Sequence, residues 1–257
     1  NAFQLVDEAG AREAAAASAT RWAEGRPLGP MDGIPLSIKD IVAMKNWPTL
    51  SGSKTVDSNG PFDEDAPAVA RLREGGAVIL GKTTTPEFGW KGMTDSPLAG
   101  ITRNPWNPAH TSGGSSGGAA ASLAAGVGAI AFGTDGGGSI RIPSNYCGVF
   151  GIKPSYGRVP HAPNDRPFST ISSGGPIART VTDAALFLNV VTQPDDRDWR
   201  ALPPDGRDYR IGLDDGVRGL RIAYAPALGG AEAAAEILAA TSEAVRVYQD
   251  LGAVVEE

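Results

Sequence analysis

A serine that follows three consecutive glycines is the residue best suited to chemistry. Ser139 lies in the stretch GTDGGGSIRIPS, residues 133–144. Such a backbone suits an exposed nucleophile better than it suits a packed core. Histidine is the usual base for a serine nucleophile, but the sequence holds only His110 and His161, both in predicted loops. A nucleophilic Ser139 would therefore need a different base.

A lysine held in its neutral form is the alternative base, and Lys39 is the candidate. It follows the short apolar run IPLSI, residues 34–38, which predicts a buried strand. Lowering a lysine pKa from about 10.4 to about 7 costs about 4–5 kcal/mol, which burial away from carboxylates can supply. A relaying hydroxyl could stand between the lysine and the nucleophile. A surface lysine at a strand end is the simpler interpretation.

Gly136, Gly137 and Gly138 would have a separate purpose. An oxyanion is stabilised by several backbone N–H groups that converge on one point with no side chain in the way. The three glycines can supply such groups, and the N–H of Ser139 would complete the set at the start of a helix. A flexible loop is the other interpretation of these glycines.

Two further hydroxyls, those of Ser115 and Ser116, lie between glycine pairs in the segment GGSSGG. An unusual backbone conformation such as a cis peptide could be accommodated there, and it would aim a hydroxyl inward. From the chemistry of the residues alone, a plain flexible turn is the simpler explanation.

Helix and strand patterns alternate along the chain, and these elements must position the candidate groups. Glycine- and proline-rich turns separate them. Such alternation predicts an α/β fold with layers around a largely parallel or mixed sheet. The predicted helices cover residues 3–24, 66–76, 117–126, 180–191 and 231–251, and the predicted strands cover 34–38, 77–80, 127–133 and 221–226.

Three motif matches have stronger structural explanations. GAVILGKT, residues 76–83, matches a phosphate-binding loop, but its apolar centre predicts a strand and Pro86 blocks the helix that should follow. GVGAIA, residues 126–131, matches a dinucleotide fingerprint, but its glycines precede the strand. GGSSG, residues 113–117, matches a hydrolase nucleophile elbow, which needs a strand before the serine and a later histidine. The elbow is the runner-up should a histidine follow residue 257.

Composition argues against several other classes of protein. The 257 residues are 41% hydrophobic and 20% charged, which is ordinary for a soluble globular protein. The net charge is −6 and no Lys/Arg run marks a nucleic-acid or membrane surface. The single cysteine, Cys147, forms no internal disulfide, leaves little for a metal site, and fits a cytoplasmic protein. The apolar run 117–134 falls short of the ~20 residues that span a bilayer.

Most of the chain, from about residue 1 to residue 191, resembles the amidase signature family. The segments that carry the resemblance occur in the family's order and approximate spacing. They are GIPLSIKD, GAVILGKTTTPEF, NPWNP, GGSSGGAAASLAAG, GTDGGGSIRIPS and GVFGIKPSYGRV. Members hydrolyse amides, and sometimes esters or carbamates, on a mixed sheet flanked by helices on both faces. The resemblance implies the same fold and reaction class here.

Family roles carry over to matching positions of this sequence. The nucleophile falls on Ser139, the cis-serine on Ser115 and the basic lysine on Lys39, which together form a Ser-cisSer-Lys triad. The oxyanion hole falls on the backbone of residues 136–139. Lys39 would then draw the proton through Ser115 while Ser139 attacks the carbonyl, and an acyl-enzyme would form and be hydrolysed.

The resemblance also implies supporting residues. Ser116 is expected to be a supporting hydrogen-bonding residue, and Asp135 and Arg141 are expected to pair and brace the glycine loop. Cys147 resembles a buried small apolar residue of the family. The family needs neither metal nor cofactor. One departure is Gly136, where relatives often carry a side chain.

Family chains are considerably longer than this one, so we expect a single catalytic domain over residues 1–257 that is incomplete at both ends. The expected partner is a small-molecule amide, with no nucleic acid bound directly and no membrane, and homodimer formation is left open. One alternative is a glutaminase that works in a complex, as the A component of a glutamyl-tRNA(Gln) amidotransferase. A non-catalytic fragment is a further alternative.

Overall fold

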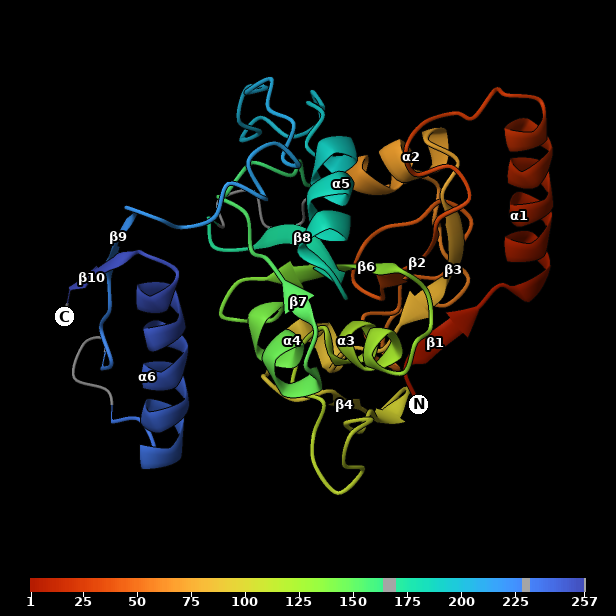
Figure 1. The fold of residues 1–257 in the computed structure, drawn as a ribbon. Helices are drawn as coiled ribbons and strands as arrows, with labels where there is room; N and C mark the ends of the chain where they lie inside the picture. The colour runs from red at the N-terminus through yellow and green to blue at the C-terminus, as the bar shows by residue number, and fades with distance from the viewer. Residues whose placement is uncertain (164–169, 228–231, 257) are drawn as a thin grey trace. The chain divides into compact units, whose positions relative to one another are not determined.

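The computed structural model describes residues 1–163, 170–227 and 232–256 (Figure 1). The chain divides into two compact units, Asn1–Tyr209 and Arg210–Glu257. All of the candidate site residues belong to the first unit. The single domain over residues 1–257 stays a prediction.

A six-stranded mixed sheet forms the centre of the first unit, in the order β1-β3-β2-β6-β8-β7. β2 runs parallel to both of its neighbours, β3 and β6, whereas the β1–β3, β6–β8 and β8–β7 pairs are antiparallel. The strands are β1 (Phe3–Val6), β2 (Pro35–Lys39), β3 (Val78–Thr83), β6 (Ile130–Asp135), β7 (Phe150–Gly151) and β8 (Ser173–Ala178). Because β2 and β6 are parallel neighbours, their carboxyl ends meet at one edge of the sheet.

Helices cover both faces of this sheet, with α2 and α5 on one side and α3 and α4 on the other (Figure 1). The fold predicted from the resemblance is therefore confirmed. The helices of the unit are α1 (Glu8–Ala23), α2 (Pro67–Glu74), α3 (Gly117–Ala124), α4 (Arg141–Cys147) and α5 (Val181–Val191), with the 3₁₀ turn η1 (Glu87–Gly89) and the small hairpin β4 (Asp95–Ser96) and β5 (Gly100–Ile101).

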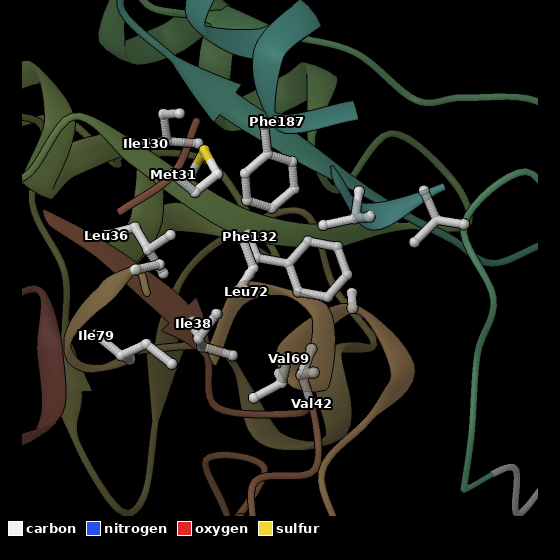
Figure 2. Packing of buried hydrophobic residues seen from close by; sticks show 14 of the residues in the cluster. Met31, Leu36, Ile38, Val42, Val69, Leu72, Ile79, Ile130, Phe132 and Phe187 are labelled. Atoms are coloured by element: carbon white, nitrogen blue, oxygen red, sulfur yellow. The ribbon is translucent and has the colours of Figure 1, made fainter. Parts of the chain in front are cut away.

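Alternation along the strands fills the two sides of the sheet separately. On β6, Phe132 belongs to the larger apolar cluster and Ala131 to the smaller one. Figure 2 shows the larger cluster, where the rings of Phe132 and Phe187 of α5 have centroids 5.8 Å apart. The smaller cluster contains alanines and Leu123 of α3. Small residues on α3 allow this helix to pack closely on the sheet.

The structure differs from the sequence prediction at residues 3–6 and at residues 173–178. Residues 3–6 form β1, an edge strand paired with β3, and the helix begins only at Glu8, after Asp7 accepts a hydrogen bond from the N–H of Gly10 at 3.0 Å. The sequence SGGPIA of β8 does not predict a strand, because glycine and proline are uncommon in strands. Backbone pairing with β6 along all six residues forms it nonetheless.

The second unit is small. It contains the parallel strands β9 (Arg221–Ala223) and β10 (Val254–Glu256) and the helix α6 (Ala235–Asp250). The observed strand β9 is thus shorter than the predicted strand 221–226. Residue 231, at the start of the predicted helix 231–251, lies outside the described residues.

Residues 117–134, the apolar run of the sequence, divide between α3 and β6. Within the described ranges, no helix combines the length and the hydropathy needed to cross a membrane.

Lys82 of β3 is a fully buried lysine that holds the loop after β2. Its Nζ lies 3.4 Å from Asp40 Oδ1, donates to the carbonyl oxygen of Val42 at 2.9 Å, and also donates to Thr49 Oγ1. Burial lowers the pKa of Lys82 to about 8, although the charge of Asp40 opposes the shift.

The substitution Lys82→Met is expected to lower the free energy of unfolding by about 3–5 kcal/mol, because it leaves Asp40 buried without its partner. Urea unfolding measures this loss. The control is Arg12→Ala, which removes the exposed pair with Glu8 and is expected to cost less than about 1 kcal/mol. Equal losses in the two variants would contradict the structural role of the buried pair.

Candidate active site

Lys39 is the last residue of β2, and its side chain is fully buried. Its Nζ donates a hydrogen bond to Ser115 Oγ at 2.6 Å and another to Thr134 Oγ1 at 3.0 Å. Thr134 lies on β6, the parallel neighbour of β2. The sheet therefore places the amine between the hydroxyl of a neighbouring strand and the hydroxyl of the loop before α3.

Burial lowers the pKa of Lys39 to about 7, although the negative charge of Asp135 acts in the opposite direction. The adjacent carboxylate, Asp40, is engaged by Lys82. A lysine with a pKa near 7 is neutral in about half of the molecules at pH 7, and its lone pair can then accept a proton from a hydroxyl. The site thus holds a lysine with the lowered pKa that the sequence argument asked of a base, and its catalytic role stays a prediction.

The GGSSGG segment contains a cis peptide rather than a plain turn. The peptide bond between Gly114 and Ser115 is cis, and Ser115 is 2% exposed. Ser116 is fully buried: its N–H donates to the carbonyl oxygen of Ser139 at 3.1 Å, and its Oγ donates to the carbonyl oxygen of Thr134 at 3.3 Å. Ser116 therefore links the loop before α3 to β6 and to the candidate nucleophile.

Asp135 organises the glycine loop. Arg141 binds its carboxylate in a bidentate manner, with Nε 2.9 Å from Oδ2 and Nη2 2.9 Å from Oδ1. The N–H groups of Ile140 and Arg141 also donate to Oδ2. Burial alone would raise the pKa of Asp135, but Arg141 and the backbone donors hold it well below its usual range. The carboxylate is therefore ionised and fixes the turn that carries Ser139.

One of the expected oxyanion-hole groups has a different partner. The N–H of Gly138 donates to Asp135 Oδ1 at 2.7 Å, and Gly138 has φ +114°. The carboxylate of Asp135 accepts this hydrogen bond because a buried negative charge is stabilised by several donors. The expectation that Gly138 supplies an oxyanion donor does not fit this geometry. Gly136 and Gly137 are exposed and lie in the wall of the cavity with Ser139.

A cavity of about 730 Å³ opens above these residues. Ser115, Thr134 and Ser139 all contribute to its lining, together with the two exposed glycines. Apolar residues form much of the remaining wall: Ile41, Val42, Met44, Phe62, Phe88, Trp90, Ile142, Val159 and Ile171. An apolar wall with a few polar groups is typical of a small-molecule site.

Four other reactive or motif residues lie outside the candidate triad: Cys147, His110, His161 and Lys82. Cys147 is buried, and burial raises the pKa of its thiol to about 11, so it is no nucleophile at neutral pH. His110 is exposed. His161 lines the cavity, and its backbone N–H donates to Asp198 Oδ2 at 2.9 Å. Residues 78–83 of the GAVILGKT segment form β3, which includes the buried Lys82, as the apolar centre predicted. In the described part of the chain, no group of three or more His, Cys, Asp or Glu could hold a metal ion.

Thr134 is the site residue that sequence reasoning missed. It precedes Asp135 in the quoted GTDGGGS segment and directly follows the predicted strand 127–133, and in the structure it belongs to β6, the neighbour of β2. Since the carboxyl ends of parallel neighbours meet, a hydroxyl at this position was the available signal.

The whole chain, residues 1–257, matches the family model described as Amidase. An acylamidase of Rhodococcus erythropolis is 40% identical over 257 residues, which cover 100% of this chain and 54% of the relative. The A component of the glutamyl-tRNA(Gln) amidotransferase of Chloroflexus aurantiacus (strain J-10-fl) is 41% identical over 255 residues, 98% of this chain and 52% of the relative. The chain spans about half the length of these curated relatives.

Solved structures agree with this result. A bacterial aryl acylamidase of the amidase signature enzymes superposes with a TM-score of 0.91 at 37% identity, over 99% of this chain and 53% of the other. The peptide amidase of Stenotrophomonas maltophilia gives a TM-score of 0.85 at 34% identity, again over 99% and 53%. Because the family model extends over every residue and the solved members share the fold, the chain belongs to the amidase signature family.

Proposed function

We propose that the protein hydrolyses the C–N bond of small to medium linear amides by means of a Ser-cisSer-Lys triad. Neutral Lys39 takes a proton from Ser115, Ser115 takes the proton of Ser139, and Ser139 Oγ attacks the amide carbonyl. Collapse of the tetrahedral intermediate breaks the C–N bond, and the leaving nitrogen receives a proton from Ser115, which Lys39 reprotonates. Water then attacks the acyl-enzyme and releases the acid.

The observation that carries this proposal is the 2.6 Å hydrogen bond between Lys39 Nζ and Ser115 Oγ, together with a cavity that both Ser115 and Ser139 line. Burial disfavours the charged form of a lysine, and a neutral amine beside a hydroxyl can accept a proton from it. The N–H groups of Gly136, Gly137 and Ser139 are the donors we assign to the oxyanion. Esters and carbamates with the same acyl geometry are further candidate substrates.

Labelling with a fluorophosphonate serine probe tests the proposed nucleophile. The full protein is expected to gain the mass of one probe, and peptide mapping is expected to locate the adduct on Ser139. Ser172→Ala provides a matched control, because Ser172 is an exposed serine of the same cavity and its loss should leave labelling intact. An adduct on Ser112, Ser115 or Ser172, or an unlabelled protein, would contradict the assignment.

The second candidate function is that of the A component of a glutamyl-tRNA(Gln) amidotransferase, because a relative of that description matches at 41% identity. Such a protein would release ammonia from glutamine only when the other components of its complex are present. Hydrolysis of simple amides by the purified protein, without glutaminase activity, favours the stand-alone amidase. A cytoplasmic location, supported by the single cysteine, is part of the proposal, and homodimer formation is left open.

A further inference from the structure

The loop that carries Ser115, residues 113–117, is closed by a single hydroxyl group. Thr94 Oγ1 donates a hydrogen bond to the carbonyl oxygen of Gly113 at 2.8 Å and accepts one from the N–H of Gly117 at 3.1 Å. One atom is therefore bonded to both ends of the loop. Thr94 is 1% exposed and has no part in the proposed triad.

The backbone around Thr94 packs directly against this loop. A Cβ atom placed on Gly114 would lie 2.8 Å from the backbone N and C atoms of Met93, and one placed on Gly117 would lie 2.2 Å from Thr94 Oγ1. Both distances are shorter than a carbon atom can approach without displacing its neighbour. The glycines of the loop therefore allow the Thr94 hydroxyl to reach the backbone groups that it binds.

The hairpin of β4 and β5 fixes the position of Thr94. The N–H of Thr102 donates to the carbonyl oxygen of Thr94 at 2.9 Å and extends the antiparallel pairing of the hairpin by one position. Thr102 Oγ1 also lies 2.6 Å from Oγ1 of Thr84, the residue that follows β3. The backbone of Thr94 is therefore tied to the end of a strand that pairs with the strand of Lys39.

The Ser115 loop thus has attachments to two different elements. Ser116 Oγ attaches it to β6 through the carbonyl oxygen of Thr134, whereas Thr94 attaches both of its ends to the segment before β4. Between these attachments, Ser115 Oγ lies 2.6 Å from Lys39 Nζ. A shift at the ends of the loop would move this hydroxyl relative to the amine, and proton transfer depends steeply on such placement.

The two contacts of Thr94 need a side chain that both donates and accepts a hydrogen bond. A hydroxyl does both, whereas a valine side chain has the same shape and does neither. Ser112 Oγ also donates to the carbonyl oxygen of Gly113, at 3.3 Å. Loss of the Thr94 hydroxyl would therefore act mainly at the Gly117 end of the loop, where its oxygen accepts the N–H.

We propose that Thr94 is a positioning residue for the reaction, and that its hydroxyl closes the Ser115 loop and so holds Ser115 Oγ where it can exchange protons with Lys39 and Ser139. The inference rests on the proposed Ser-cisSer-Lys mechanism and adds to it a residue that contacts only the loop. Thr94 is not one of the described residues that line the cavity. Its loss should therefore change kcat and not KM, because KM reports substrate binding when acylation is slow.

Steady-state hydrolysis of acetanilide measures the effect. Thr94→Val is expected to lower kcat about 10- to 100-fold and to leave KM within about twofold. Thr94→Ser keeps the hydroxyl and should retain kcat to within about threefold. Thr94→Ala lacks the same methyl group as the serine variant and lacks the hydroxyl as well. Comparing the serine and alanine variants isolates the hydroxyl even if the valine variant fails to fold.

The matched control is Thr102→Val. It removes the hydroxyl of another threonine that is 1% exposed and belongs to the same segment of chain, but whose partner is Thr84 Oγ1. Its kcat is expected to stay within about twofold of the wild-type value, even where its unfolding midpoint falls as far as that of Thr94→Val.

The rate at which a fluorophosphonate probe labels Ser139 distinguishes placement of Ser115 from general damage to the site. Thr94→Val is expected to slow labelling at least about tenfold in the wild-type background and less than about twofold in a Ser115→Ala background. In the second background, the group that Thr94 positions is already absent. Ser115→Ala alone should slow labelling, because the relay to Lys39 is then lost.

The outcomes are distinct. Near-normal kcat in a folded Thr94→Val or Thr94→Ala protein, an equal loss in Thr102→Val, or a rise in KM alone would overturn the positioning role. A loss that persists undiminished in the Ser115→Ala background would overturn it as well. A wild-type protein that is not labelled on Ser139, or whose labelling is unaffected by Ser115→Ala, would overturn the proposed function, and this inference with it.

Discussion

Replacing Ser139 with alanine is expected to reduce amide turnover by about 10⁵-fold or more. Its Oγ is the atom that bonds to the acyl group in the proposed reaction, and no other group in the mechanism can take that place. The remaining oxyanion donors and substrate contacts would give only the residual catalysis that survives loss of a nucleophile. Steady-state release of the amine from acetanilide measures the effect.

The matched control is Ser172→Ala, which removes a hydroxyl from the same cavity and is expected to leave kcat within about twofold, because the exposed Ser172 hydroxyl takes no part in the proposed reaction. Circular dichroism and the unfolding midpoint of both variants should match those of the unmodified protein. Near-normal turnover by a folded Ser139→Ala protein would refute the assignment of the nucleophile.

Local sequence patterns were sufficient for much of the fold. The apolar runs before Lys39 and before Ser139 correctly predicted strands β2 and β6, since a short buried run between turn signals favours a strand. The resemblance to the amidase signature family predicted that the sheet is mixed. In contrast, β8 is formed by pairing with β6 rather than by the propensity of its own SGGPIA sequence. Its formation could not be predicted from that segment alone.

The site was predictable in its residues and less so in its contacts. Lys39 and Ser115 are 76 positions apart, and only the arrangement of the strands brings them to 2.6 Å. Thr134 became visible only once β6 was placed beside β2. Likewise, the sequence could not show that the carboxylate of Asp135 captures the Gly138 N–H, because this contact depends on the turn of a loop. The catalytic roles proposed for the residues of this site stay predictions.

The pH dependence of acylation provides the sharpest test of Lys39. Burial lowers the pKa of Lys39 to about 7, and only the neutral amine accepts a proton. Wild-type kcat/KM for a non-ionising amide such as acetanilide is therefore expected to rise about tenfold per pH unit up to about pH 7 and to level off above it. Lys39→Met is expected to lose several orders of magnitude in kcat/KM, because Ser115 then has no proton acceptor.

The loss in Lys39→Met should be largest at and below pH 7 and should shrink above it. The wild-type rate is constant once the amine is neutral, whereas a variant that relies on hydroxide continues to gain rate as the pH rises. Lys39→Arg is a useful companion variant, because it keeps a long basic side chain whose guanidinium stays protonated throughout this range. It should be as inactive as Lys39→Met if neutrality is what matters. An active Lys39→Arg protein, or an acid limb near pH 7 that persists in Lys39→Met, would mean that another group titrates.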